Sequence, residues 1–133
     1  MKKITEHWLK VASDDLLAAK QLLSVEGLSN LVAFHAQQCI EKSMKALLEE
    51  TELPNVKTHD LMRLYRILQP EITISDTATL VFLNGLYTDS RYPGDTGLMP
   101  EGKPTADEAM FFVTFAEEIY HQLKGHVEVK FPG

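Results

Sequence analysis

Hydrophobic side chains recur every three or four residues through most of the chain, which is the spacing of one face of an α-helix. The recurrence predicts helices over about residues 5–25, 30–50, 58–68, 75–87 and 105–123. Turn-forming residues separate these ranges, with Gly27 after the first, Pro54 after the second and Pro70 after the third. The pattern therefore predicts an all-α fold, an antiparallel up-and-down bundle of four to five helices in a single domain over residues 1–133.

The range 30–50 predicts a helix that is buried on about half of its surface. At about 100° per residue, its small and apolar side chains fall on one arc: Val32, Ala33, Ala36, Cys39, Ile40, Ser43, Met44, Ala46 and Leu47. The opposite side is a polar stripe formed by His35, Gln38, Lys42, Lys45 and Glu49 and interrupted by Leu31. We therefore expect this helix to be central in the bundle.

Capping residues suggest where the helices begin and end. Thr105 and Glu108 have the spacing of a capping box at the start of the last helix. Gly125 is expected to end that helix, which leaves "HVEVKFPG" as a short extended piece or a disordered end. N-cap candidates for the second, third and fourth helices are Ser29 or Asn30, Thr58 and Ser75.

Charge and composition narrow the possible functions. The formal net charge of -6 disfavours a protein that coats nucleic acid through bulk charge, so any phosphate binding must be local. The single cysteine excludes an internal disulfide, and no apolar run reaches the roughly 18 residues of a membrane span. We therefore expect a cytoplasmic protein with no membrane partner.

Signatures of metal sites and common enzymes are absent from the sequence. The five histidines show no HExxH spacing, and no CxxC, GxGxxG, Walker A, GxSxG or SxxK sequence occurs. His35 and Cys39 are four residues apart, but Cys39 belongs to the apolar arc and His35 to the polar stripe. We expect neither a metal nor a cofactor.

The stretch "LYTDSRYPGD" at residues 86–95 opens a segment, 88–104, that is too rich in proline and glycine for a helix or strand. Arg91 could interact favourably with the dipole at the C-terminal end of the preceding helix and pair with Asp89 or Asp95. Alternatively, its guanidinium could bind a phosphate through two hydrogen bonds while the ring of Tyr92 stacks on a base. A long loop in a compact domain is often functional, so Arg91 and Tyr92 are candidate ligand-binding residues.

The polar stripe is a second candidate. Lys42 and Lys45, with Gln38 and His35 a turn earlier, could line a site for an anionic ligand. Glu41 and Lys45 also have the spacing of a surface ion pair, so a solvated charged stripe is the alternative interpretation.

Several segments occur in a distinctive order along the chain: "AFHAQQCIEKSMKALLEE" at 33–50, "THDL" at 58–61, "SRYPGD" at 90–95 and "PTADEAMFF" at 104–112. Together with "WLKVASDDLLAAKQLL" from Trp8, they resemble the HEPN domain family over nearly the whole chain. The RYP element is similar to a branch of the family that is associated with minimal nucleotidyltransferases and keeps the arginine.

The resemblance implies a helical bundle that forms a homodimer, often beside a minimal nucleotidyltransferase partner and in some cases within a toxin-antitoxin pair. Many HEPN proteins are metal-independent ribonucleases, in which an arginine is followed after four to six residues by a histidine. This chain has Thr96, Gly97 and Leu98 at the positions where that histidine would follow Arg91, and Arg63 and Arg66 do not complete the motif either.

The departure from the motif favours binding over catalysis. The preferred hypothesis is a dimeric module that binds a nucleotide or an RNA phosphate through Arg91, Tyr92 and the polar stripe. The alternatives are a ribonuclease that uses Arg91 with a non-motif histidine such as His35, and a purely structural interaction domain.

Overall fold

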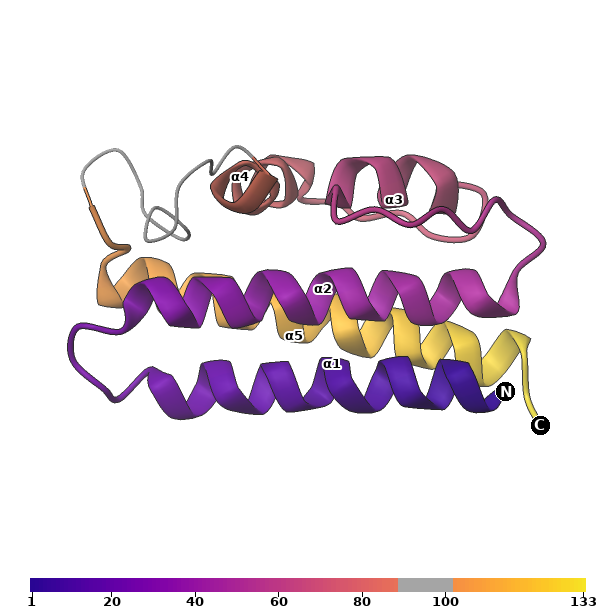
Figure 1. The fold of residues 1–133 in the computed structure, drawn as a ribbon, viewed down its shortest axis with the longest axis horizontal. Coiled ribbons are helices and arrows are strands. Elements are labelled where there is room, and N and C mark those ends of the chain that lie inside the picture. The colour runs from indigo at the N-terminus through magenta and orange to yellow at the C-terminus, as the bar shows by residue number, and fades with distance from the viewer. Residues whose placement is uncertain (89–101) are drawn as a thin grey trace.

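The structure is a computed structural model that describes residues 1–88 and 102–133. It contains five helices: α1 (Lys3–Leu22), α2 (Ser29–Glu50), α3 (Leu61–Leu68), α4 (Thr77–Thr88) and α5 (Ala106–Lys130) (Figure 1). These helices confirm the predicted all-α bundle. Arg91 and Tyr92 lie outside the described residues.

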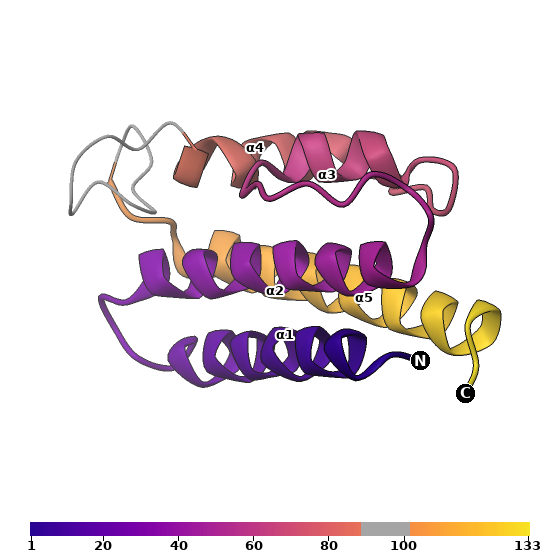
Figure 2. The ribbon, with the colours of Figure 1, turned by 45° about the vertical axis from the view of Figure 1, so that its right-hand side comes forward.

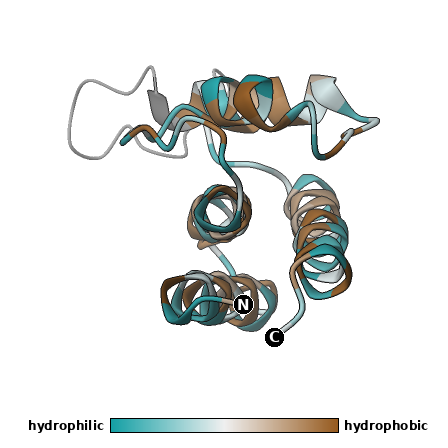
Figure 3. Ribbon diagram, turned by 90° about the vertical axis from the view of Figure 1, so that its right-hand side faces the viewer, coloured by the Kyte–Doolittle hydropathy of each residue, from teal (hydrophilic) through white to brown (hydrophobic). Residues whose placement is uncertain are grey.

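The helices form two layers. The long helices α1, α2 and α5 pack side by side, with α1 antiparallel to α2, and both chain termini lie at the same end (Figure 1). The shorter α3 and α4 lie over α2 as a second layer (Figure 2). Viewed from the end of the bundle, α1, α2 and α5 form a triangle and the α3–α4 layer lies across it (Figure 3).

Helix α2 is the centre of the molecule because it packs against each of the other four helices. All nine residues of the predicted apolar arc are buried, as expected. Three further residues of α2 are also buried, namely Gln37, Glu41 and Leu48, because partners cover α2 on more than one side. A polar stripe placed on such a helix cannot be fully solvated.

The starts of three helices differ in detail from the sequence-based expectations. Asp60 rather than Thr58 caps α3, since its Oδ1 accepts from the backbone N–H groups of Met62 and Arg63. Asp76, next to Ser75, accepts from the backbone N–H of Thr79 at the start of α4. At α2 the Ser29 hydroxyl donates to the carbonyl of Pro104 and makes no cap.

Helix α5 begins with the predicted capping box of Thr105 and Glu108 but continues beyond Gly125 to Lys130. The expectation of an extended or disordered tail is therefore wrong for residues 126–130. Val127 is fully buried, and His126 and Lys130 both contact the carboxylate of Glu71. These tertiary contacts stabilise the last helical turns, and no neighbouring atom crowds Gly125 within the helix.

Candidate functional site

The four residues of the polar stripe that were predicted to bind a ligand lie on α2, but the structure divides them between two carboxylates. His35 and Lys42 bind Asp15, whereas Lys45 binds Glu41. Gln38 donates to the side-chain carbonyl of Gln37, and the side-chain N–H of Gln37 donates to Glu41. The stripe is therefore two polar networks rather than one continuous anion site.

The first network, the Asp15 network, joins α1 to α2. Asp15 is nearly buried, and its two carboxylate oxygens face different partners: His35 Nδ1 lies 2.8 Å from Oδ1 and Lys42 Nζ lies 2.6 Å from Oδ2. The His35 and Lys42 side chains are 28% and 25% exposed, so both reach solvent. A carboxylate bound to one ring nitrogen of a histidine orients that ring, as it does at many catalytic and metal sites.

The second network, the Glu41 network, joins α2 to the connector at residues 51–60. Glu41 is only 2% exposed, and its Oε2 lies 2.8 Å from Lys45 Nζ and 3.0 Å from His59 Nδ1. The Lys45 side chain is 15% exposed, while that of His59 is 85% exposed. Glu41 thus anchors a nearly buried lysine and draws the connector onto α2.

These contacts place Lys45 beside Trp8 of α1. Lys45 Nζ lies 5.4 Å from the centroid of the Trp8 ring, within the range of a cation–π interaction. The indole N–H of Trp8 donates to Glu49 over 3.4 Å. Lys45 therefore has an ion-pair partner on one side and an aromatic ring on another.

A pocket of about 580 Å³ opens at this point. It is lined by Trp8, Lys45, Glu49 and the connector residues 55–59, which return along α2 toward α3 (Figure 1). The volume is within the usual range of small-molecule sites. The sequence did not predict this pocket, because the connector has no periodic pattern that would place it against α1 and α2.

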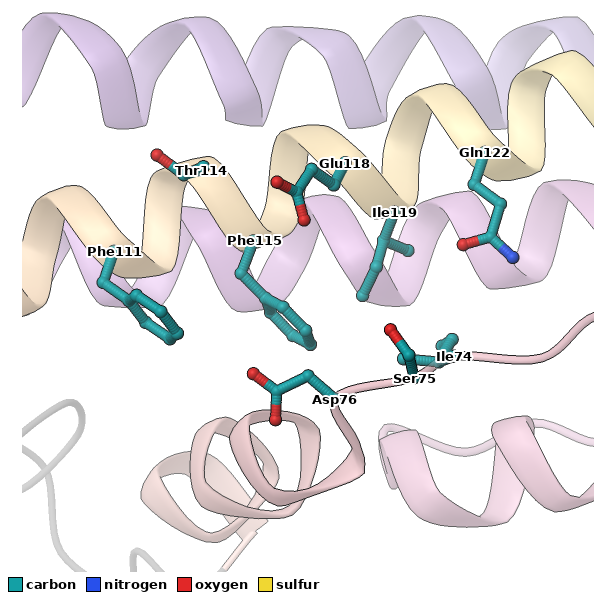
Figure 4. Close-up of a pocket in the computed structure, with 9 residues that line it drawn as sticks. All are labelled: Ile74, Ser75, Asp76, Phe111, Thr114, Phe115, Glu118, Ile119 and Gln122. Carbon is teal, nitrogen blue, oxygen red and sulfur yellow. The ribbon is translucent and has the colours of Figure 1, made fainter.

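A second cavity lies between α5 and the segment that leads into α4 (Figure 4). Its volume is about 160 Å³, and its walls carry the rings of Phe111 and Phe115 together with the carboxylates of Asp76 and Glu118. Asp76 has a lowered pKa because the hydroxyl and the backbone N–H of Thr79 bond to it. A small cavity whose charged groups are acidic does not suit a phosphate.

Beside this cavity, large apolar side chains reach the surface of α4 and α5. Val81, Phe82, Met110 and Phe111 are exposed. The rings of Phe82 and Phe112 stack with centroids 5.8 Å apart, and Phe111 contacts Phe112 edge-on, so aromatic side chains link the two helices. We call Val81, Phe82, Met110 and Phe111 the α4–α5 apolar surface.

Within residues 1–88 and 102–133, no group of three histidine, cysteine or acidic side chains is arranged to hold a metal ion. Cys39 is fully buried, and burial raises the pKa of its thiol to about 12, only partly offset by a hydrogen bond with Ser43. The thiol is therefore an inert core group, as the sequence indicated. None of the described helices is long and apolar enough to cross a lipid bilayer.

Comparison with known proteins supports the resemblance noted in the sequence. The family model for the HEPN domain matches residues 5–126. The crystal structure of an archaeal HEPN homologue superposes with a TM-score of 0.69 and 31% sequence identity, covering 96% of this chain and 99% of that one. A search of curated proteins gave no match. The chain belongs to the HEPN domain family.

Proposed function

We propose that this HEPN chain is a dimeric module that binds a nucleotide or an RNA phosphate and acts with a nucleotidyltransferase partner, in the manner of a toxin-antitoxin pair. Arg91 and Tyr92 are its proposed ligand-facing residues outside the described part of the chain. Within the described part, His35, Gln38, Lys42 and Lys45 are the proposed contributors.

The arrangement of cationic side chains on α2 is the observation that carries this proposal. Lys42 and Lys45 are each held at one position by a nearly buried carboxylate while remaining partly exposed. A fixed lysine loses less conformational entropy on binding an anion than a free surface lysine does. Since the arginine-to-histidine spacing of HEPN ribonucleases is absent from the sequence, such groups suit binding better than cleavage.

The α4–α5 apolar surface supports the dimer part of the proposal. Val81, Phe82, Met110 and Phe111 are all exposed on α4 and α5, and exposed large apolar side chains are often found at protein interfaces. Phe111→Glu should cost about 2 kcal/mol or more of association free energy. Light scattering after size exclusion would detect the resulting monomer, and Val129→Glu on the exposed end of α5 is the matched control.

Ligand binding is tested by calorimetric titration of the purified protein with nucleotides and short RNAs. We expect binding in the wild type, and a loss of about tenfold or more in Arg91→Ala, because bonds between a charged donor and a phosphate contribute about 1.5–3 kcal/mol. Arg63→Ala is the matched control because Arg63 is exposed on α3. Equal binding by wild type and Arg91→Ala would exclude the Arg91 site.

A second candidate function is metal-independent RNA cleavage that uses Arg91 and His35. The hydrogen bond between His35 Nδ1 and Asp15 favours it, because a carboxylate that orients an imidazole is a recurring element of general acid–base sites. RNA cleavage in the presence of chelator that is lost in both Arg91→Ala and His35→Ala would support this function. Intact RNA at high protein excess would exclude it.

A further inference from the structure

The pocket between Trp8 and the connector combines groups of different chemistry. The indole ring of Trp8 forms part of the lining, with Lys45 Nζ 5.4 Å from its centroid. The lining also contains Lys57 and His59, so three nitrogen-bearing side chains can contact an anion. Asn55 and Thr58 add neutral hydrogen-bonding groups.

The charges around the pocket favour an anion over a cation. Two lysines line it against one carboxylate, Glu49, which accepts the hydrogen bond from Trp8. The other nearby carboxylate, Glu41, binds Lys45 and His59 from the buried side.

The size of the pocket suits a small molecule. A volume of about 580 Å³ is within the usual range of small-molecule sites and accommodates an aromatic ring system with one attached anionic group. Lys45 is held by Glu41, so part of the site is fixed before a ligand arrives.

We propose that this pocket binds a small planar aromatic anion, whose ring stacks on Trp8 and whose anionic group is held by Lys45, Lys57 and His59. Nucleoside monophosphates and aromatic carboxylates share this chemistry. The site is formed from described residues of α1, α2 and the connector, and its existence does not depend on Arg91.

Trp8 is the single tryptophan of the chain, so fluorescence excited at wavelengths that tyrosine does not absorb reports on this pocket. Titration of the full chain with AMP, UMP or benzoate should give saturable quenching by at least one of them, and the effective compound identifies the source of the anion. Adenosine and inorganic phosphate, each carrying half of the proposed ligand, should bind at least tenfold more weakly than AMP if AMP is effective. No quenching by any of the three aromatic anions at millimolar concentration would overturn the proposal.

Lys57→Ala is the most direct variant, because Lys57 is exposed and its loss should leave the fold intact. We expect about a tenfold rise in the concentration needed for half-maximal quenching. Lys124→Ala, on α5 with a side chain that is 44% exposed, is the matched control and should behave as wild type. Equal quenching of wild type and Lys57→Ala would contradict the proposed anion contact.

The two proposals fail separately. If Arg91→Ala loses RNA binding in calorimetry but keeps the Trp8 quenching, both sites exist and are independent. If no RNA binds at all, the quenching experiment still tests the pocket. If Arg91→Ala abolishes the quenching, the claim that the pocket is independent of Arg91 is wrong.

Discussion

Asp15 and Glu41 bind the same two types of side chain in different surroundings. Asp15 holds His35 and Lys42 between two long helices, and its partners are both about one quarter exposed. Glu41 holds Lys45 and His59 between α2 and the connector, with one partner nearly buried and the other mostly exposed. The same residue types therefore have different roles in the two networks. Around Asp15 they connect two helices, whereas Lys45 and His59, the partners of Glu41, line a pocket.

Removing the Glu41 carboxylate should have the largest effect. Glu41→Gln leaves Lys45, whose side chain is 15% exposed, without its charge partner, so we expect a loss of about 3 kcal/mol in the free energy of unfolding. Chemical denaturation measures this change. Glu118→Gln on the exposed face of α5 is the matched control and should change stability by less than about 0.5 kcal/mol. A loss as small as the control's would mean that Glu41 is not a structural anchor.

Replacing the Asp15 carboxylate by an amide should reduce the free energy of unfolding by a smaller amount. In Asp15→Asn, Lys42 and His35 remain partly exposed and can be rehydrated, so we expect a loss of about 1–2 kcal/mol. The measurement is again chemical denaturation, compared directly with Glu41→Gln. A greater loss for Asp15→Asn than for Glu41→Gln would reverse the proposed order of the two networks.

Glu71 is a third carboxylate that binds a histidine and a lysine, namely His126 and Lys130. The hydrogen bond from Lys130 lowers the pKa of Glu71 below 4.5. Desolvation opposes this shift, and the hydrogen bond from His126 adds to it. The resulting stabilisation is complete above the unfolded-state pKa and is lost as the pH falls through the lower folded-state pKa. Unfolding measured below pH 5 should therefore show a shallower acid decline in Glu71→Gln than in wild type. Identical acid profiles would contradict this assignment.

The fold could be predicted from the sequence to the extent that local pattern determines it. The apolar arc of α2 and the capping box at Thr105 depend on residues within one or two helical turns, and both were predicted correctly. The end of α5 was not predicted correctly, because Glu71, from another part of the chain, stabilises it. The caps at Asp60 and Asp76 were missed by one or two residues, because several capping residue types occur together there.

The candidate site was predictable only in part. His35, Gln38, Lys42 and Lys45 were identified as a stripe, but periodicity cannot show that Asp15 of α1 binds two of them. The Glu41–Lys45 pair was visible from its four-residue spacing, yet its burial depends on the packing of the connector. The pocket at Trp8 requires α1, α2 and the connector together, so no single sequence window contains it.

Labelling of Cys39 should show the smallest effect of all, since no reaction is expected in the native protein. The same labelling can report whether the core of each variant is still closed. Because burial raises the pKa of its thiol to about 12, a thiol-reactive reagent at pH 8 should not label the native protein. Labelling should appear only when denaturant unfolds the chain. Rapid labelling of the native wild type would mean that the core around α2 opens more readily than its packing indicates.

The division of the stripe is tested most directly by Trp8 fluorescence in Lys45→Met and Lys42→Met, with folding confirmed by circular dichroism. Titrated with the effective aromatic anion, Lys45→Met should need about ten times more ligand for half-maximal quenching, while Lys42→Met should change by less than about twofold. That result would place ligand binding at the Glu41 network. An equal loss of ligand affinity in the two variants, or a loss of affinity only in Lys42→Met, would contradict binding at the Glu41 network.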